Sequence, residues 1–566
     1  MTDVPTAGPR RFLPLLLALL TSGLVILALP TFELAAIGLI AWAPLLVALR
    51  PNPWSSAQVG PENMSALTRR QRFWLGLLTG FVYQLVLFRW IPFTLTEMTP
   101  FPSALTWLMV TLYALWHGLQ IALFCAWLPS VHRLVSTRLP AFTPVSTALF
   151  FAFVEWAFPA LFPWSYGHTV WELGPVAAPL LSFQGVPLMT FWVLLPSALI
   201  AELVVQSTPT FRASHPTLRR NTLVAGLGTL ILTLLIPTLV RELTLETSND
   251  RLRVAIVQPN FTLAEKKKAT RQTRLKLLDR LESQLRALPP GELDLIVGSE
   301  GAFPLWWQLD AGPLPTDAPA ASRKPDPLLE GTRRVQRAIA EGPRAHTILG
   351  GLRYDEDGET RNAAVHLAPD GQIRGHYDKQ TLVPFSEYVP FADLIPSLKE
   401  IPGIGHMIPG TRPCRFDAGL ETGPVAIGCG ICYESMFADD TRHDAGDARL
   451  LVNLTIDTWF GTSTAPRMHL MSHASRAAEL GIPLLRAGLT GISAIIGPDG
   501  QVLASLPLDT AGVLRAEIAL TTGTTLYREL GQVLMPLVGL LLLAAVLHAL
   551  IRRLRARRPP ALAGSP

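Results

Sequence analysis

Eight long apolar runs are the feature that most constrains how this chain can fold. Each run is long enough to cross the hydrocarbon core of a bilayer, which takes about 20 helical residues. Charged residues make up only 16% of the 566-residue chain, against about 25% in soluble globular proteins. The runs cover residues 12–29, 34–49, 73–92, 103–128, 141–163, 177–206, 221–240 and 532–551. We therefore predict a multi-pass α-helical membrane bundle of about eight spans.

The same runs divide the chain into four predicted parts. Residues 1–240 would hold seven transmembrane helices, and residues 532–551 would form the C-terminal transmembrane helix. Residues 552–566 are a basic tail. Residues 241–531 contain no such run and are predicted to form a separate domain. The first run is interpreted as a retained helix, because no small-residue cleavage site of a signal peptide follows it.

Arginine gathers in every second loop between the apolar runs. It occurs before the first run, in the loops that follow the second, fourth and sixth runs, and after the eighth, whereas residues 93–102 and 164–176 contain no Lys or Arg. Short loops rich in Lys and Arg stay on the cytoplasmic side of a membrane. We therefore expect a bacterial inner-membrane protein with both termini in the cytoplasm and residues 241–531 in the periplasm. The same rule explains the formal net charge of +5, so nucleic-acid binding is the weaker interpretation.

Residues 252–520 alternate short β-type runs with helical patterns, which is typical of a layered α/β fold. Pro369-Asp370-Gly371 and Pro498-Asp499-Gly500 each separate two β-type runs, as the turns of β-hairpins do. Two stretches rich in proline, 311–326 and 391–411, are predicted to be long loops, which are usually lids or mobile segments. The β-type runs are 253–258, 293–298, 347–353, 362–368, 425–431, 450–456 and 492–497, and the helical patterns include 264–287 and 465–480.

Cys432 stands at the end of a β-type run, just before a polar turn, which is where an exposed nucleophile belongs. A buried structural cysteine is the commoner alternative. A redox pair with Cys429 is less favoured, because side chains three residues apart in a strand point to opposite faces. A zinc site is also disfavoured, since it needs four ligands and only Cys414 joins these two cysteines.

Glu300 and Lys379 also follow β-type runs. Alone, each would be interpreted as a solvated surface residue. With Cys432 they make a set for acyl transfer, in which the glutamate accepts the thiol proton, the thiolate attacks a carbonyl carbon and the ammonium stabilises the oxyanion. His469 and His473, four residues apart on a predicted helix, offer an alternative Cys/His arrangement that would leave Glu300 and Lys379 without a role.

Residues 252–520 resemble the nitrilase, or carbon–nitrogen hydrolase, superfamily, with its Glu–Lys–Cys order as Glu300, Lys379 and Cys432. The segment YDKQTLVPFSEYVP at 377–390 is similar to the superfamily's most specific segment. With the membrane runs, the whole chain resembles the apolipoprotein N-acyltransferase family. Further matching segments are AWAPLLVAL at 41–49, FPWSYGHT at 162–169, CYE at 432–434, WFG at 459–461 and ELGIPLLRAG at 479–488.

The resemblance implies a nitrilase-type αββα sandwich on the membrane bundle. It also implies supporting roles at the site for Glu387, Tyr433 and Glu434. Three segments depart from the family pattern and bear on substrate fit: Gly298-Ser299 before Glu300, Thr455-Ile456 before Asp457, and Leu489-Thr490.

The activity implied by the resemblance is transfer of an acyl chain from a glycerophospholipid, through a Cys432 thioester, to the N-terminal α-amine of a diacylglyceryl-cysteine apolipoprotein. The partners are then a phospholipid donor and an apolipoprotein acceptor, and we expect no metal or other cofactor. One alternative is a membrane-anchored amidase or nitrilase that acts on a small substrate. The other is an inactive membrane scaffold, against which the intact Glu, Lys and Cys argue.

Four aromatic residues are candidates for contact with lipid. Trp306 and Trp307 follow Glu300 closely, and Trp459 and Phe460 lie in the WFG segment. Tryptophan favours the membrane interface because an apolar ring carries one N–H that can stay hydrated. We expect Trp306 and Trp307 to form an apolar lip at the bilayer surface, with a place in the domain core as the alternative.

Overall fold

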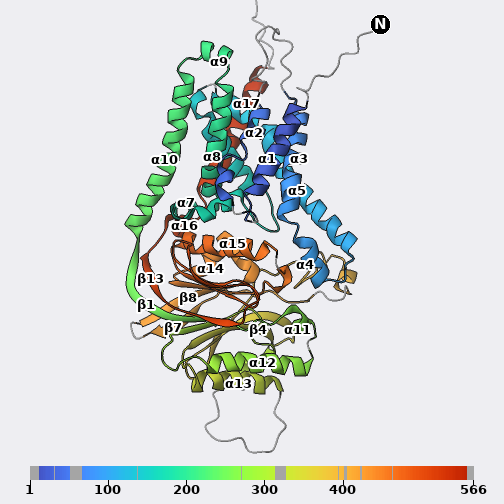
Figure 1. Ribbon diagram of the computed structural model, residues 1–566, viewed down its shortest axis with the longest axis vertical. Coiled ribbons are helices and arrows are strands. Elements are labelled where there is room, and N and C mark those ends of the chain that lie inside the picture. The colour runs from blue at the N-terminus through green and yellow to red at the C-terminus, as the bar shows by residue number, and fades with distance from the viewer. Residues whose placement is uncertain are drawn as a thin grey trace, which may run out of the picture.

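The computed structural model describes residues 12–556, apart from residues 51–66, 313–326, 401–404 and 421–422 and positions 31, 33, 137, 269, 393 and 462. Figure 1 shows an elongated molecule with a helical bundle at one end and an α/β domain at the other. Arg10 and Arg11, most of the predicted loop 311–326 and residues 557–566 of the basic tail lie outside the described residues.

The bundle is built by the first half of the chain and by its last helix. Its longer helices are α1 (Leu13–Leu27), α3 (Arg69–Leu87), α5 (Ser103–Ser136), α6 (Thr143–Ala157), α8 (Val186–Val205), α10 (Leu218–Thr244) and α17 (Leu534–Ala556). Shorter elements are η2 (Ala35–Leu39), α2 (Ala43–Ala48), α4 (Ile91–Met98), η4 (Pro140–Phe142), η5 (Tyr166–Val176), α7 (Ala177–Gln184) and α9 (Pro209–Ser214). Helix α10 runs along one side of the bundle and continues without a break into the α/β domain (Figure 1).

Every predicted apolar run falls on helix, but the helices differ in length. Among the described residues, α5, α8 and α10 are each long and apolar enough to cross a membrane. The pair α3 and α4, bent by 51°, would make a fourth span if it counts as one. The run 177–206 is divided by Gly185, whose φ of +69° ends α7. The runs at 12–29, 34–49 and 532–551 give apolar helices of 10–17 residues, so the count of eight spans stays a prediction.

Two sheets form the centre of the α/β domain. The first has the strand order β13-β1-β2-β4-β5-β6, with β3 paired to β4, and the second has the order β12-β11-β10-β9-β8-β7. The first sheet comprises β1 (Leu245–Gln258), β2 (Leu295–Gly298), β3 (Trp306–Trp307), β4 (His346–Tyr354), β5 (Thr360–Leu367), β6 (Ile373–Asp378) and β13 (Gly512–Gly523). The second comprises β7 (Phe416–Leu420), β8 (Gly423–Ile431), β9 (Leu450–Thr455), β10 (Leu484–Gly488), β11 (Ser493–Ile496) and β12 (Val502–Leu506).

Helices cover the outer face of each sheet. Helices α11 (Leu263–Lys267), α12 (Arg271–Arg286) and α13 (Pro327–Glu341) lie on the face away from the bundle, and α14 (Ala438–Ala445), α15 (Ala465–Leu480) and α16 (Leu526–Leu530) lie between the second sheet and the bundle (Figure 1). Short turns of 3-10 helix are η6 (Leu309–Ala311), η7 (Pro396–Glu400), η8 (Cys432–Met436) and η9 (Thr458–Phe460).

Side-chain alternation along the strands explains these layers. In β1, Leu252, Val254 and Ile256 join the apolar core between the two sheets, whereas Ala255 and Val257 join the core beneath α12 and α13. This is the period of two that a strand requires when both of its faces are buried. The result is the αββα sandwich that the resemblance predicted.

The local signals in the sequence locate most elements of this domain. The two Pro-Asp-Gly sequences join β5 to β6 and β11 to β12, and both pairs are antiparallel. The predicted helical pattern 465–480 coincides with α15. Strands β3, β7, β10 and β13 were not among the predicted β-type runs, whereas β6 and β12 are the second strands of the two predicted hairpins.

Candidate active site

An apolar cavity lies where the bundle meets the α/β domain. It encloses about 820 Å³ of space, counting its open mouth. Glu300, Lys379 and Cys432, which are far apart in the sequence, all line it. The bundle contributes Phe88, Trp90, Thr94, Met98, Phe162 and Trp164, and the α/β domain adds Val383, Ser386, Glu387, Tyr433, Met436, Ile456, Trp459, Phe460, Ala465, Met468 and His469.

Cys432 is the first residue of η8, directly after strand β8. Its φ is +53°, a left-handed conformation that is uncommon for residues other than glycine and is found at functional sites. The side chain is 9% exposed. Burial and the carboxylate of Glu300 raise the pKa of the thiol from 9.0 to about 12, although Lys379 and the Thr455 hydroxyl act in the opposite direction. The resting group is therefore a thiol that needs a base.

Glu300 follows β2 and is 6% exposed. Asn362 on β5 donates a hydrogen bond of 2.6 Å to its Oε1 atom. Among the residues that the structure describes, none donates a hydrogen bond to Glu300 Oε2, although this atom is buried. One carboxylate oxygen is thus held in place and the other is free to accept a proton.

Lys379 follows β6 and is 1% exposed. Its Nζ lies 2.9 Å from Glu387 Oε1 and 3.7 Å from Glu300 Oε1. Burial acts to lower the pKa of Lys379, but Glu387 and Glu300 outweigh it and raise the pKa above its ordinary value. The side chain is therefore a fixed ammonium ion in the lining of the cavity.

Glu387 holds this arrangement together. Its Oε1 accepts a second hydrogen bond of 2.9 Å from Asn362 Nδ2, and its Oε2 accepts one of 2.8 Å from the backbone N–H of Val383. Asn362 therefore links Glu300 to Glu387 and sets the spacing of both carboxylates around Lys379. Asn362 was not among the predicted site residues, because no pattern in the residues around it indicates that β5 lies beside both glutamates.

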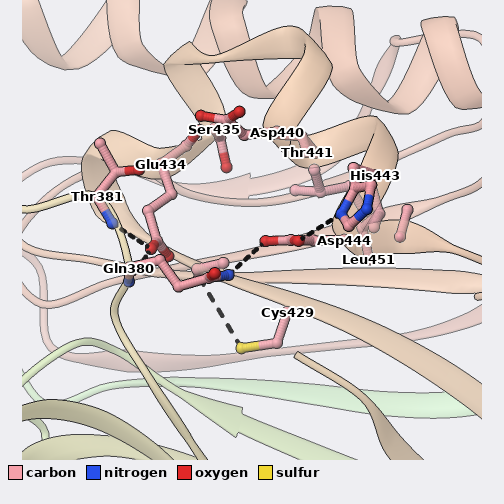
Figure 2. Close-up of a pocket in the computed structure, with 13 residues that line it drawn as sticks. Gln380, Thr381, Cys429, Glu434, Ser435, Asp440, Thr441, His443, Asp444 and Leu451 are labelled. Carbon is pink, nitrogen blue, oxygen red and sulfur yellow. Dashed lines mark hydrogen bonds and ion pairs between the residues drawn. The ribbon is translucent and has the colours of Figure 1, made fainter. Parts of the chain in front are cut away.

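Glu434 lies beside the active-site cavity rather than in it. It lines a second pocket, in which Figure 2 shows its carboxylate next to Gln380 and Thr381. Glu434 Oε1 accepts hydrogen bonds from the backbone N–H groups of Gln380 (2.6 Å) and Thr381 (3.0 Å), and Oε2 accepts one from Ile431 (2.6 Å). Glu434 thus ties the segment after Lys379 to the strand end before Cys432.

Tyr433 links the nucleophile turn to the bundle. Its hydroxyl donates a hydrogen bond to the backbone carbonyl of Leu161, and its ring packs edge-on against Phe162 at 5.4 Å between centroids. Both partners belong to the segment after α6. A movement of this segment of the bundle would therefore displace Tyr433, the residue next to Cys432.

A buried polar network supports the backbone of Cys432 from the other side. His469 Nε2 lies 3.2 Å from the carbonyl oxygen of Cys432, and its Nδ1 lies 3.1 Å from Asp457 Oδ1. Arg486 donates a hydrogen bond of 2.7 Å to Asp457 Oδ2. Because a carbonyl oxygen can only accept, Nε2 carries a proton here. The ring nitrogens thus face the backbone and Asp457, not the thiol, which disfavours the Cys/His alternative; His473 Nδ1 faces the carbonyl of His469 at 2.6 Å.

The comparisons with known proteins agree with this two-part architecture. A family model for the carbon-nitrogen hydrolase domain matches residues 253–528, and one for the apolipoprotein N-acyltransferase N-terminal domain matches residues 21–199. The chain is similar to an apolipoprotein N-acyltransferase of Geobacter metallireducens, at 29% identity over 93% of each chain, and to one of Brucella melitensis, at 29% identity over 95% of each. The chain thus matches the apolipoprotein N-acyltransferase family over nearly its whole length.

One further relative and one solved structure are also similar to this chain. The apolipoprotein N-acyltransferase of Haemophilus ducreyi is 27% identical over 91% of this chain and 95% of its own. Among solved structures, Saccharomyces cerevisiae Nit3, a member of branch 10 of the nitrilase superfamily, matches 48% of this chain and 93% of its own at 15% identity, with a TM-score of 0.33.

Two of the predicted lipid contacts, Trp459 and Phe460, do line the active-site cavity. The Phe460 ring meets Trp90 of the bundle edge-on at 5.1 Å between centroids, and Thr94 donates a hydrogen bond of 3.1 Å to the carbonyl of Trp459. The WFG segment therefore joins the two parts of the molecule at the cavity.

The predicted lip of Trp306 and Trp307 is wrong. Trp307 is 2% exposed and stacks on Phe303 at 4.0 Å in the core beneath α12 and α13. Trp306 stacks on Tyr354 and lies under the guanidinium of Arg274 on α12. These helices cover the face of the sandwich away from the bundle (Figure 1). The core alternative holds because β3 adds both tryptophans to the edge of β4.

Exposed apolar side chains gather instead on the loop after Glu387. Phe391 is 71% exposed, Leu394 80% and Ile395 51%. The same loop packs Val389 and Ala392 against Phe101, which follows α4 of the bundle. The sequence had predicted a loop at 391–411, but not that its apolar residues would lie open next to the bundle.

Proposed function

We propose that this chain transfers an acyl chain from a glycerophospholipid, through a thioester on Cys432, to the N-terminal α-amine of a diacylglyceryl-cysteine apolipoprotein. The match to the apolipoprotein N-acyltransferase family supports the reaction class. The observation that carries the proposal is the apolar cavity, which joins Glu300, Lys379 and Cys432 to aromatic side chains of the bundle. Each methylene of an acyl chain costs roughly 0.8 kcal/mol when exposed to water, so a cavity open to membrane helices favours this substrate over a small polar one.

In the first half-reaction, Glu300 accepts the proton of the Cys432 thiol through its free Oε2. The thiolate attacks the ester carbonyl of the phospholipid, and negative charge develops on the carbonyl oxygen. The ammonium of Lys379, together with backbone N–H groups in the first turn of η8, stabilises that charge. Collapse of the intermediate breaks the C–O bond, and Glu300 returns its proton to the departing lysophospholipid.

The second half-reaction uses the same groups in reverse. The α-amine of the apolipoprotein attacks the thioester carbon, and Glu300 accepts a proton from the amine. Lys379 again stabilises the oxyanion, and the Cys432 thiolate leaves and regains its proton. Glu387, Tyr433 and Glu434 act as positioning residues, through Lys379, the bundle and the strand end respectively.

The placement in the membrane is part of the proposal. We infer eight spans, in which α1, η2 with α2, and the apolar part of α17 (Leu534–His548) each cross a locally thinner bilayer. The arginine pattern supports cytoplasmic termini and a periplasmic domain over residues 241–531 in the inner membrane. Phe391, Leu394 and Ile395 then enter the outer lipid surface and give an acyl chain an apolar route to Cys432.

Mass spectrometry of the purified protein tests the proposal. Incubation with a phosphatidylethanolamine of defined chain length should leave one acyl group on Cys432 that hydroxylamine removes, and a diacylglyceryl lipopeptide should then take up that acyl group. The matched control is Cys125→Ala, which removes a buried cysteine of α5 and should keep the adduct, whereas Cys432→Ala should lose it. Hydrolysis of small amides at a comparable kcat/KM, without any phospholipid adduct, would favour the amidase alternative.

A further inference from the structure

Two cysteines outside the catalytic set lie opposite each other on neighbouring antiparallel strands. In the pairing of β7 with β8, Phe416 lies opposite Ile427 and Asp417 opposite Ala426. Each step back along β7 is matched by a step forward along β8. Two further steps place Cys414, just before β7, opposite Cys429 on β8.

The side chains of this pair share one face. A period of two puts Cys414 on the face of Phe416, and Cys429 on the face of Ile427. All four belong to the apolar core between the two sheets. Burial, and next the neighbouring Cys429 thiol, raise the pKa of Cys414, as expected for two buried thiols on one face. Figure 2 shows Cys429 on the opposite side of the second pocket from Ser435.

The strand geometry meets the requirements of a disulfide. Residues directly opposite in an antiparallel pair have Cα atoms about 4.5 or 5.5 Å apart. Disulfides join Cα atoms about 4.4–6.8 Å apart. The register of β7 and β8, extended by two residues, gives Cys414 and Cys429 this spacing, at which side-chain rotation brings the two sulfur atoms to bonding distance.

We propose that Cys414 and Cys429, which are free thiols in this structure, form a structural disulfide in the mature protein. This rests on the proposed periplasmic placement, because disulfides persist in oxidising compartments and are rare in the cytosol. Each thiol loses its proton, and the pair gives up two electrons as one S–S bond forms. The disulfide of an extracytoplasmic thiol oxidase takes up the two electrons and two protons and becomes a dithiol. Both sulfur atoms are buried, so the reaction belongs to folding, before the sheets close.

This cross-link would protect the nucleophile. Cys429 stands three residues before Cys432, and an unfolded CxxC segment closes its own disulfide readily in an oxidising compartment. Once β8 has formed, the two cysteines face different cavities. Pairing Cys429 with Cys414 during folding leaves Cys432 as the free thiol that acyl transfer requires.

Counting thiols in the full-length protein tests the cross-link. Membranes are denatured in acid and treated with an alkylating maleimide without reductant, and the protein is digested for mass spectrometry. We expect alkylated Cys125 and Cys432, and a cross-linked peptide pair holding Cys414 and Cys429 that is lighter than the reduced pair by two hydrogen atoms. Alkylation of all four cysteines before reduction would overturn the proposal.

A topology control separates this result from the proposed function. In a Ser505→Cys variant, the new thiol lies on the exposed side of edge strand β12, and a membrane-impermeant maleimide should label it in intact spheroplasts. If it is labelled and all four native thiols are free, the disulfide is refuted while the acyl-transfer proposal stands. If it is not labelled, the periplasmic placement fails and the disulfide fails with it.

Two variants test the protective role. Cys414→Ser should lose part of its transfer activity through a Cys429–Cys432 disulfide and regain it with a phosphine reductant. The double variant Cys414→Ser with Cys429→Ser should keep its activity without reductant, because Cys432 then has no neighbour to pair with. Equal activity of the single and double variants in the absence of reductant would refute protection of the nucleophile.

Discussion

Replacing Glu300 by glutamine should make the Cys432 thiol easier to ionise and yet make acyl transfer slower. The carboxylate of Glu300 is one reason that the pKa of the thiol is raised from 9.0 to about 12, second only to burial. Glutamine has the same shape, and its amide oxygen can still accept the hydrogen bond from Asn362 Nδ2. Glu300→Gln should therefore lower the pKa of the thiol and yet slow acyl transfer.

The structure gives the size of both effects. A rise of the Cys432 pKa from 9.0 to about 12 disfavours the thiolate by about 4 kcal/mol, at 1.36 kcal/mol per unit. The thiolate is then on the order of one part in 10⁵ at pH 7. Losing the Glu300 charge removes only part of this, because burial remains. Losing the general base should slow transfer by about 10²–10⁴-fold, or about 3 to 5 kcal/mol of activation free energy.

Both quantities can be measured on the same preparations. The rate at which iodoacetamide modifies Cys432, followed by mass spectrometry of its peptide against pH, reports the thiol pKa. Acyl transfer to a lipopeptide reports catalysis. The control is Glu356→Gln, at an exposed position outside the site, which should change neither. An alkylation midpoint at the same or a higher pH in Glu300→Gln would refute the assigned coupling, and an undiminished transfer rate would refute the assigned base.

Four further predictions follow from the same contacts. Lys379→Met should slow formation of the acyl-enzyme by about 10²–10³-fold, and Lys379→Arg should not restore it because a guanidinium is larger and planar; intact-protein mass spectrometry over time measures this, and a wild-type rate in either variant would contradict the role. His469→Gln, whose amide N–H can still reach the Cys432 carbonyl, should retain more transfer activity than His469→Ala, and the ratio of kcat between the two variants is the readout. Burial acts to raise the pKa of Asp457, but Arg486 and His469 outweigh it and lower this pKa from 3.8 to about 2. The ionised carboxylate therefore contributes about 2 kcal/mol of stability above pH 3.8, and this contribution is lost as the pH falls through about 2. In Asp457→Asn, the melting temperature measured against pH should therefore fall less steeply on the acid side. Phe391→Ser with Leu394→Ser should slow acylation by long-chain phospholipid while leaving iodoacetamide modification of Cys432 unchanged, and an equal loss of both would argue against an apolar route over this loop.

Local patterns in the sequence were enough to predict many of the strands and helices of the α/β domain. The two Pro-Asp-Gly turns and the pattern at 465–480 depend on residues that are neighbours in the chain, and the structure has β-hairpins and α15 there. Strand β13 was not predicted, because it is half-exposed and polar residues interrupt its apolar character. The number of spans could not be settled by counting apolar residues, because bends and breaks, such as the one at Gly185, depend on what each helix packs against.

The sequence by itself determined that the chain has a membrane part and an α/β part, and that Glu300, Lys379 and Cys432 each follow a strand. The end of a strand depends mainly on residues that are neighbours in the chain, so the local sequence is sufficient to predict its position. Only the tertiary structure decided that Asn362 links two glutamates, that His469 contacts the Cys432 backbone rather than its thiol, and that Trp307 lies in the core while Phe391 is exposed. Each of these depends on strands and loops brought together from distant parts of the chain, because hydrogen bonding and burial are set by neighbours in space, and the order of residues does not specify them locally.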